Sequence, residues 1–241
     1  GILEIRSKVP IRDHHILNTL YVPPEALVPA HVIRDDEEKV YELTGKGNLV
    51  GIVTDGSAVL GLGDIGPQAA LPVMEGKAAL FQALAGVEAF PICLAEREPD
   101  LVVRHVESIS PSFGGINLED IAAPRCFEIE ERLKESLDIP VFHDDQHGTA
   151  IVVLAAMINA TKLTRRDLSE LKIVVNGAGS AGMAVSKLMM SRGVGDLILC
   201  DRAGAITADR KERMDSYKRQ IGEVSNKEQK TGSLSDVLAG A

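Results

Sequence analysis

The sequence predicts an α/β fold with parallel strands, and three observations support this prediction. Short apolar runs alternate with segments of helical character along the 241 residues. Two glycine-rich turns, at residues 61–66 and 177–182, each follow an apolar run. The second turn belongs to a complete strand, helix and strand unit. Because such alternation forms parallel sheets covered by helices, we expect one or two domains of this class.

Composition and charge exclude several classes of protein. Apolar residues make up 45% of the chain and charged residues 25%, as in globular proteins. The net charge of −9 comes without a basic stripe, so nucleic acid is not expected as a partner. The longest apolar run, residues 150–158, is shorter than the roughly 18 residues that cross a bilayer, so no membrane partner is expected. Cys93, Cys126 and Cys200 lie far apart, which predicts reduced thiols and a cytoplasmic protein.

The first glycine-rich turn lies between two predicted strands, residues 49–53 and 89–94. Residues 78–85 are rich in Ala and Leu and predict a helix that ends at Gly86. We expect Pro67 and Pro72 to disturb the entry to this helix. The nearest downstream acid, Glu88, precedes the next strand instead of following it. The turn is therefore interpreted as active-site scaffolding, with a second nucleotide site as the alternative.

Two acidic pairs lie about 25 residues apart in the middle of the chain. Glu119-Asp120 opens a charged periodic segment, residues 119–137, that predicts a helix. Asp144-Asp145 forms an acidic turn between a predicted strand, residues 139–142, and a predicted helix, residues 149–163. Oxygen ligands without cysteine favour Mg²⁺ or Mn²⁺, although acidic pairs also serve as solvated helix starts. His143 and His147 flank the second pair, either as ligands or as residues that cap or bridge other groups.

The second glycine-rich turn has the pattern of a dinucleotide-binding fingerprint. A β-branched strand, residues 173–175, enters it, and a helix leaves it toward Arg192. After the next apolar run, residues 197–200, Asp201 stands 19 residues beyond the last glycine, where an acid can accept from ribose hydroxyls. This predicts NAD as the cofactor, with NADP open because Arg202 could pair with a 2′-phosphate, and a purely structural turn as the alternative. The residues assigned to the cofactor are Gly177, Gly179, Ser180, Ala181, Gly182, Asp201 and Arg202.

Two further residues are candidates for acid and base chemistry. Lys77 follows Gly76 at the start of the apolar helix. Its side chain can lie along the apolar surface with the ammonium group in water. Alternatively, Lys77 can act as a general base, because an apolar setting favours the neutral amine. Tyr21 precedes two prolines and on its own is interpreted as a packing residue.

Three strings together resemble the malic enzymes, in their compact bacterial form. They are GSAVLGLGDIGPQAALPVMEGKAALFQALAGVEAFPICL, SFGGINLEDIAAPRCFEIEERL and IPVFHDDQHGTAIVVLAA. The resemblance implies oxidation of (S)-malate with NAD or NADP, decarboxylation to pyruvate, and a requirement for Mg²⁺ or Mn²⁺. It also implies roles for six residues: Glu119, Asp120 and Asp145 as metal ligands, Lys77 as general base, Asp144 as its support, and Tyr21 as general acid. The chain departs from the pattern at Val22-Pro23-Pro24, where the family usually has Thr-Pro-Gly.

The resemblance further implies two domains and a longer protein. Residues 1–148 would hold malate and metal, and residues 149–241 would form the first part of a Rossmann domain. Since a dinucleotide domain has two halves, we expect the native chain to continue beyond Ala241, and we expect a homo-oligomer, a dimer. The rival interpretations are an amino-acid dehydrogenase of two domains, which needs no metal, and a non-catalytic nucleotide-sensing module.

Overall fold

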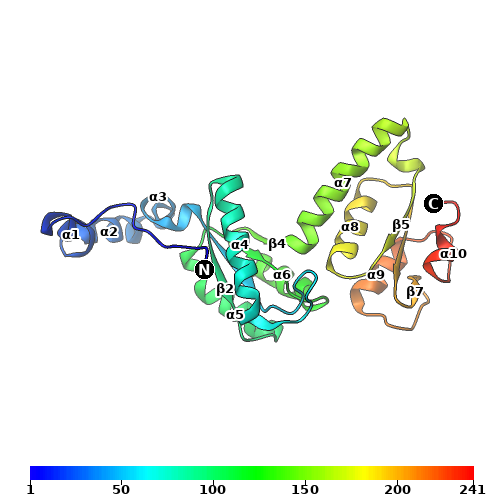
Figure 1. The fold of residues 1–241 in the computed structure, drawn as a ribbon, viewed down its shortest axis with the longest axis horizontal. Helices are drawn as coiled ribbons and strands as arrows, with labels where there is room; N and C mark the ends of the chain where they lie inside the picture. The colour runs from blue at the N-terminus through cyan, green and yellow to red at the C-terminus, as the bar shows by residue number, and fades with distance from the viewer. The chain divides into compact units, whose positions relative to one another are not determined.

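The computed structural model describes residues 1–241, apart from the side chain of residue 26 (Figure 1). The chain forms two compact units that interleave along the sequence. The first unit consists of Gly1–Leu118 and Arg132–Val141, and the second of Glu119–Glu131 and Phe142–Ala241. The functional division at residue 148 stays a prediction.

A four-stranded sheet has the order β2-β1-β3-β4. Its strands are β1 (Leu49–Thr54), β2 (Glu88–Cys93), β3 (Gly115–Leu118) and β4 (Val141–His143). β1 pairs in parallel with both β2 and β3, which confirms the predicted parallel sheet. Sequence reasoning missed β3 because it has only four residues and contains a polar one, Asn117, although all four are buried.

The long helix α4 (Gly66–Ala85) begins directly after the first glycine-rich turn, so the predicted start at residue 78 was wrong. Pro67 lies in the first turn, where no N–H donor is needed, whereas Pro72 lies inside the helix. The helix continues through Pro72 because Ala70, Met74 and Ala78 form a buried face, and Met74 and Ala78 pack with Ile52 of β1. Gly86 ends the helix in the left-handed region, as predicted, with φ of 67°.

Two more helices and a 3-10 turn complete the middle of the chain: α5 (Pro99–Ile109), η4 (Ser110–Ser112) and α6 (Arg125–Ser136). The predicted helix over residues 119–137 is therefore correct only in its second part. Glu119 and Asp120 do not begin a helix, because they leave β3 directly and Asp120 adopts a positive φ of 54°. This places both carboxylates on the connection between a strand and a helix.

The N-terminal part is made of short helices: α1 (His14–Tyr21), η1 (Glu25–Leu27), α2 (Val28–Asp35), η2 (Glu37–Lys39), α3 (Val40–Leu43) and η3 (Gly45–Asn48). Asp13 caps α1 by accepting a hydrogen bond from the N–H of Ile16. Among their described residues, α1, α2 and α3 contain none that is buried. Tyr21, the last residue of α1, is 81% exposed, so it is not the packing residue expected from the sequence alone.

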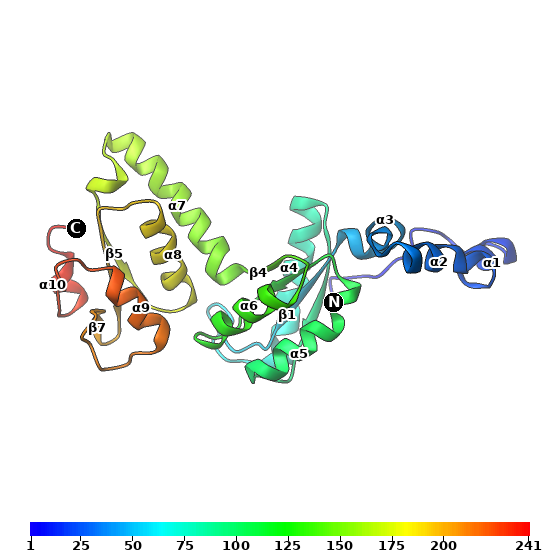
Figure 2. The ribbon, with the colours of Figure 1, turned by 180° about the vertical axis from the view of Figure 1, so that it is seen from behind.

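The second unit begins its main part with α7 (Asp144–Thr164), which packs along α8 (Ser180–Ser191) (Figures 1 and 2). The predicted start of α7 at residue 149 was wrong, because Asp144 and Asp145 form its first turn. Acidic side chains are favourable there, since the helix N-terminus carries a partial positive charge. Of the helices in the described part of the chain, none is both long and apolar enough to cross a membrane.

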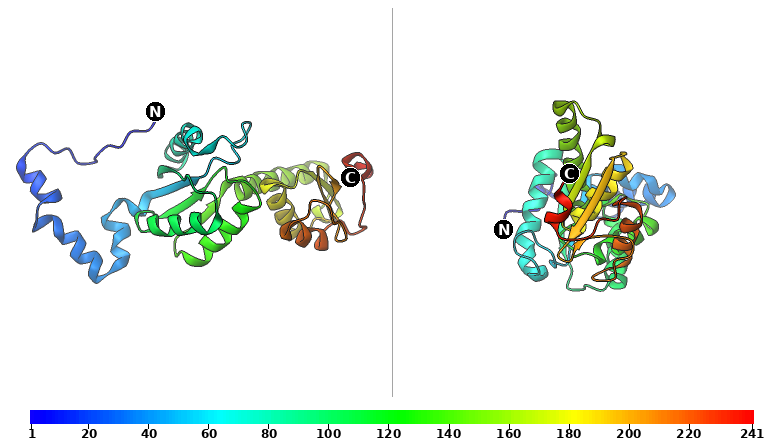
Figure 3. Two further views of the ribbon diagram at one scale, coloured as in Figure 1. Left: turned by 90° about the horizontal axis from the view of Figure 1, so that it is seen from below. Right: turned by 90° about the vertical axis from the view of Figure 1, so that its right-hand side faces the viewer.

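A second sheet has the order β5-β6-β7 and forms the core of this unit. β5 (Lys172–Asn176) and β6 (Asp196–Asp201) are parallel, and β7 (Gly204–Ala205) is antiparallel to β6. The predicted unit of strand, helix and strand around residues 177–182 is confirmed. The remaining elements are η5 (Leu168–Glu170), α9 (Ser216–Val224) and α10 (Leu234–Leu238). α10 lies beside β5 and β7, at the red end of the ribbon (Figure 3). Its Val237 packs against Ile198 of β6.

Candidate functional site

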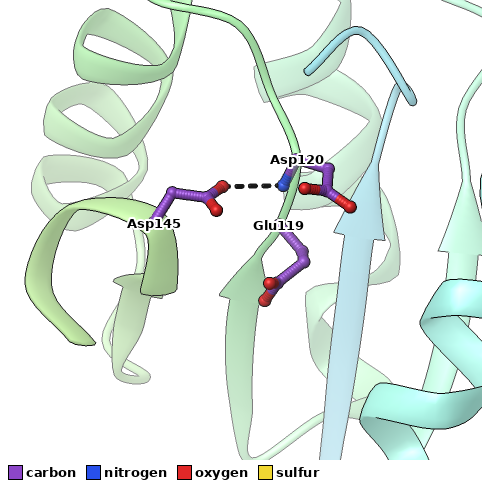
Figure 4. A group of neighbouring side chains, drawn as sticks. All are labelled: Glu119, Asp120 and Asp145. Atoms are coloured by element: carbon purple, nitrogen blue, oxygen red, sulfur yellow. Dashed lines mark hydrogen bonds between the residues drawn. The ribbon is translucent and has the colours of Figure 1, made fainter. Parts of the chain in front are cut away.

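Three carboxylates converge in the second unit, at the point where α7 begins. Glu119, Asp120 and Asp145 each offer an oxygen, and these oxygens lie within 4.8 Å of one another. Figure 4 shows the Asp145 carboxylate directed at the backbone of the Glu119-Asp120 segment. Its Oδ2 accepts a hydrogen bond of 2.8 Å from the N–H of Asp120. The two acidic pairs singled out in the sequence therefore contribute to a single cluster.

The dimensions and the donor set of this cluster suit a hard divalent cation. Two oxygens on opposite sides of one octahedral Mg²⁺ stand about 4.2 Å apart, so the carboxylates need only a small adjustment to share an ion. Asp120 is buried, and the Asp145 side chain is 29% exposed, which leaves the cluster reachable from solvent. The donors are carboxylate oxygens, as Mg²⁺ and Mn²⁺ prefer.

A buried carboxylate from α6 fixes the start of α7. Glu130 is only 4% exposed and accepts hydrogen bonds from the N–H of His143 at 3.1 Å and from Nε2 of Gln146 at 3.1 Å. His147 Nε2 lies 2.8 Å from the same carboxylate. His147 thus bridges two helices, in agreement with one of the two roles considered for it. These contacts hold the turn that presents Asp145.

Two other groups stand close to the cluster without belonging to its oxygen set. His143 is fully buried, and its Nε2 lies 3.2 Å from Oδ2 of Asp145. Burial raises the pKa of the Cys126 thiol to about 12, and the charges of Asp145 and Glu130 add to this effect. The donor set is therefore described by the carboxylate oxygens alone, which are the ligands that Mg²⁺ and Mn²⁺ prefer over sulfur.

The second glycine-rich turn has the geometry of a phosphate-binding loop. Gly177 adopts a φ of 123°, which side chains rarely tolerate. A Cβ on Gly182 would collide with the carbonyl oxygen of Gly177, so this position lets α8 approach the turn. A Cβ on Gly179 would meet nothing within 4 Å. The turn therefore leaves open space in front of Ser180, the first residue of α8, where free N–H groups favour an anion.

This open space is part of a cavity of about 440 Å³ in the second unit. The residues that line it are Asn176, Gly177, Ala178, Gly179, Asp201, Arg202, Arg213 and Lys218. β5 supplies Asn176 and β6 supplies Asp201, so the cavity lies at the carboxyl ends of two parallel strands, where α/β sheets bind ligands. The turn and the cavity together fit a dinucleotide.

The Asp201 carboxylate is held by two cations that the sequence did not indicate. Arg210 donates from Nη1 to Oδ1 at 2.8 Å and from Nη2 to Oδ2 at 2.7 Å. Lys218 Nζ donates to Oδ2 at 2.9 Å, and the N–H of Ala203 donates to Oδ1 at 2.9 Å. Burial acts to raise the pKa of Asp201, but the hydrogen bonds from Arg210 and Lys218 outweigh it and hold the pKa well below its usual range.

Two family models match this sequence and together account for most of it. The model described as "Malic enzyme, N-terminal domain" matches residues 19–134, and the model "Malic enzyme, NAD binding domain" matches residues 146–240. The chain belongs to the malic enzyme family. The resemblance noted from the three sequence strings is thereby confirmed.

Similar malic enzymes come from several organisms. The chain is 53% identical over 241 residues to a bifunctional malic/malolactic enzyme of Bacillus subtilis, covering 100% of this chain and 58% of that protein. It is 52% identical over 241 residues to an NAD-dependent malic enzyme of Geobacillus stearothermophilus, covering 100% of this chain and 50% of that protein. The chain thus spans about half the length of these curated relatives.

A solved structure of an NAD-dependent malic enzyme from Thermotoga maritima is similar to the whole chain. The TM-score is 0.96 at 48% identity, covering 100% of this chain and 64% of that chain. The α/β architecture predicted from the sequence is therefore that of solved members of the malic enzyme family.

The residues assigned to acid and base chemistry lie in both units. Tyr21 and Lys77 belong to the first unit, Tyr21 exposed on α1 and Lys77 half-buried on α4. Asp144 belongs to the second unit, where it precedes Asp145 in the first turn of α7. The structure brings the three expected metal ligands together, while the roles of Tyr21, Lys77 and Asp144 stay predictions.

Sequence reasoning missed the residues that surround Asp201. Arg210, Arg213 and Lys218 lie in the polar segment 207–230, where no apolar pattern marks their positions. The available signal was weak: these three are among five cations within the 17 residues after the fingerprint acid. Glu130 was also missed, because an acid in a charged helix usually faces water.

Proposed function

We propose that the protein to which this chain belongs oxidises (S)-malate with NAD or NADP and releases pyruvate and CO₂. The observation that carries this proposal is the presence of a three-carboxylate cluster and a phosphate-binding turn in one chain of the malic enzyme family. The names of similar proteins support it, since they include NAD-dependent and NADP-dependent malic enzymes.

Glu119, Asp120 and Asp145 are the residues that hold a divalent cation, Mg²⁺ or Mn²⁺, in this proposal. Such a cation, when bound, polarises the C2 oxygen of the substrate in both steps of the reaction. Glu130 acts through α7: its three hydrogen-bonding contacts fix the turn that presents Asp145. It is thus a positioning residue.

The proton transfers are assigned to three residues. Lys77 accepts the proton of the C2 hydroxyl while hydride passes from C2 to the nicotinamide, and Asp144 supports Lys77 in this role. The β-carboxylate then leaves as CO₂, and the electrons of the broken bond form an enol as Lys77 returns its proton to the C2 oxygen. Tyr21 donates a proton to C3 while Lys77 takes the hydroxyl proton back, which gives pyruvate.

The cofactor is held by the glycine-rich turn and by the residues that end β6. The N–H groups at the start of α8, from Ser180, Ala181 and Gly182, would hold the pyrophosphate. Asp201 and Arg202 would contact the adenosine ribose. This assignment rests on the open space beside Gly179 and on the cavity that continues from it.

The test uses the full-length natural protein and follows NAD(P)H absorbance with malate, in the presence of Mn²⁺ or of EDTA. We expect turnover only with the metal. Asp145→Asn should weaken the affinity for Mn²⁺, measured by calorimetry, at least tenfold and should reduce turnover. Tenfold is the lower end of the loss that follows when only a residue behind the metal ligands is changed. Asp138→Asn, the same change at an exposed position, serves as the control.

Undiminished turnover of Asp145→Asn in EDTA would contradict the metal assignment. Metal-independent oxidation of an amino acid would favour the rival dehydrogenase. Binding of NAD(P) without any malate-dependent reduction would favour a nucleotide-sensing module.

We also propose that the protein is a homo-oligomer, a dimer. The described residues of α1, α2 and α3 include none that is buried, and Leu20, Val28 and Val32 are exposed there at 44%, 59% and 40%. Grouped apolar exposure of this kind marks interaction surfaces. Light scattering should give twice the mass of one chain, and the mass of a single chain at assay concentrations would contradict the proposal.

A further inference from the structure

The second unit contains another cavity, of about 350 Å³, where α7 and α8 end. Its lining comes from the last turns of α7, the segment that leads into η5, and the residues that follow α8. α8 begins at the second glycine-rich turn, beside the cavity proposed for the dinucleotide, and its 12 residues make it about 18 Å long. The two cavities therefore lie at opposite ends of this helix.

The lining of the second cavity has an excess of positive charge. Lys162, Arg166 and Arg192 line it, against the single carboxylate of Asp167, which leaves an excess of two positive charges. The chain as a whole has a net charge of −9, so this excess is a local feature. Each of the two arginines can hold a phosphate group through two parallel N–H donors.

The three cations are not needed to complete the ends of the helices. Cations near a helix C-terminus often interact with its last carbonyl groups, but here other donors bond those groups. On α7, Thr164 Oγ1 donates to the carbonyl oxygen of Ala160 at 2.8 Å. On α8, Ser191 Oγ donates to the carbonyl oxygen of Leu188 at 2.8 Å, and the N–H of Arg192 donates to the same oxygen.

The side chains of the three cations also make no ion pair and no hydrogen bond within the described part of the chain. Asp167 does not neutralise them through a contact, because its carboxylate caps η5 by accepting from the N–H of Glu170. All three cations are exposed. Their charges are therefore available to an anion that enters the cavity.

Two apolar side chains belong to the same lining. Ile158 lies one turn before Lys162 on the same face of α7, and Leu168 of η5 is half-buried. A volume of about 350 Å³ falls in the range of cavities that hold small organic ligands, about 300–1,000 Å³. The cavity thus offers space and apolar contact beyond what an inorganic anion uses.

We infer that this cavity binds a small phosphate monoester, at a site separate from that of the dinucleotide. A phosphate monoester brings roughly two negative charges on one group at neutral pH, which matches the excess of two positive charges in the lining. Lys162, Arg166 and Arg192 would hold the phosphate, and Ile158 and Leu168 would contact the organic part. Binding here involves neither the carboxylate cluster nor the glycine-rich turn, so it can be tested apart from the proposed reaction.

The experiment measures binding to the full-length protein by calorimetry, with propyl phosphate as the probe. Inorganic phosphate and succinate are the comparison ligands, the first without an organic part and the second with carboxylates in place of the phosphate. The variants are Arg166→Gln and Arg192→Gln. Arg165→Gln is the matched control, because Arg165 is an exposed cation next to Arg166 and does not line the cavity. Each titration is repeated with saturating NAD.

We expect propyl phosphate to bind at one site per chain and more tightly than inorganic phosphate or succinate. Each variant loses charge-assisted hydrogen bonds to the phosphate, so its affinity for propyl phosphate should fall about tenfold. Arg165→Gln should keep the affinity within about threefold, since an exposed charge outside the cavity contributes little. Saturating NAD should leave the affinity unchanged, and added salt should lower it.

Absence of propyl phosphate binding would overturn the inference, and so would an equal loss of affinity in Arg165→Gln and the two variants. Competition between NAD and propyl phosphate would assign the probe to the other cavity, and tighter binding of succinate would contradict the choice of a phosphate. If the natural protein binds propyl phosphate as expected but does not reduce NAD(P) with malate, the proposed function fails and this inference stands.

Discussion

Gly182 and Gly179, in the second glycine-rich turn, have opposite surroundings. Substitutions at these two positions therefore allow effects on stability to be separated from effects on nucleotide binding. A Cβ on Gly182 would overlap the carbonyl oxygen of Gly177 and lie 2.9 Å from its carbonyl carbon. These are backbone atoms, and Gly177 is tied to β6 by a hydrogen bond from its N–H to the oxygen of Cys200. In contrast, a Cβ on Gly179 meets nothing within 4 Å, and its backbone at φ −88° suits any residue.

Gly182→Ala should therefore destabilise the protein. Overpacking costs about 1–3 kcal/mol, and the backbone obstacle places this change near the upper value. The better helix propensity of alanine offsets about 1 kcal/mol. The net loss of about 2 kcal/mol corresponds to a fall in Tm of roughly 4–8 °C for a protein of this size.

Gly179→Ala should leave Tm within about 2 °C, since substitutions into open space change stability by less than about 0.5 kcal/mol. Its added methyl group enters the cavity proposed for the pyrophosphate, so the affinity for NAD(P) should fall at least tenfold. Scanning calorimetry gives Tm, and titration of the same samples gives the affinity. An unchanged Tm in Gly182→Ala, or an unchanged affinity in Gly179→Ala, would refute the interpretation of this turn.

Three other changes test other parts of the structure. Gly148→Ala places a Cβ against the carboxylate of Asp144 on the same helix face. Turnover should fall, while the free energy of unfolding stays the same or rises by up to about 1 kcal/mol. Turnover equal to that of the natural protein would argue against a role for Asp144. Asp201→Asn leaves Arg210 and Lys218 without their counter-ion, so it should cost about 3–5 kcal/mol at neutral pH. Because the pKa of Asp201 is lowered in the folded state, its contribution is present above the unfolded value near 3.8 and lost as pH falls below it; urea unfolding at several pH values should show a flatter acid limb in the variant. Burial, with the charge of Glu131, raises the pKa of Tyr217 to about 12. The contribution of Tyr217 to stability is therefore present below about pH 10 and lost as the pH rises toward 12. In urea unfolding at alkaline pH, Tyr217→Phe should not show this loss of stability.

The parts of the fold that sequence reasoning identified are those with strong local signals. The β-branched residues of β5, the turn after it and the apolar run of β6 follow one another within 30 residues. Each of these elements is specified by its own residues. The start of α4 was missed because local rules assign a cost to Pro72, whereas the burial of Met74 against β1 is a tertiary effect.

The cationic surroundings of Asp201 could not be predicted for a similar reason. The segment after β7 has little regular structure before α9, and Arg213 adopts a positive φ of 52°. The positions of Arg210 and Lys218 depend on this irregular path of the backbone. Sequence spacing identifies the acid at the end of β6, but the partners of that acid are set by tertiary structure.

The two sites in this chain follow from one property of α/β sheets. Residues that leave neighbouring strands at their carboxyl ends meet at the same edge of the sheet. β3 and β4 are neighbours, and the residues after them, Glu119-Asp120 and Asp144-Asp145, include the three that meet in the carboxylate cluster. β5 and β6 are neighbours, and their ends line the cavity proposed for the dinucleotide. The strand order therefore explains why acids 25 residues apart converge. A helix beginning at Glu119 would not bring them together, because the chain has to leave the sheet after β3 before a helix can start. Asp120, with its positive φ, lies in that connection.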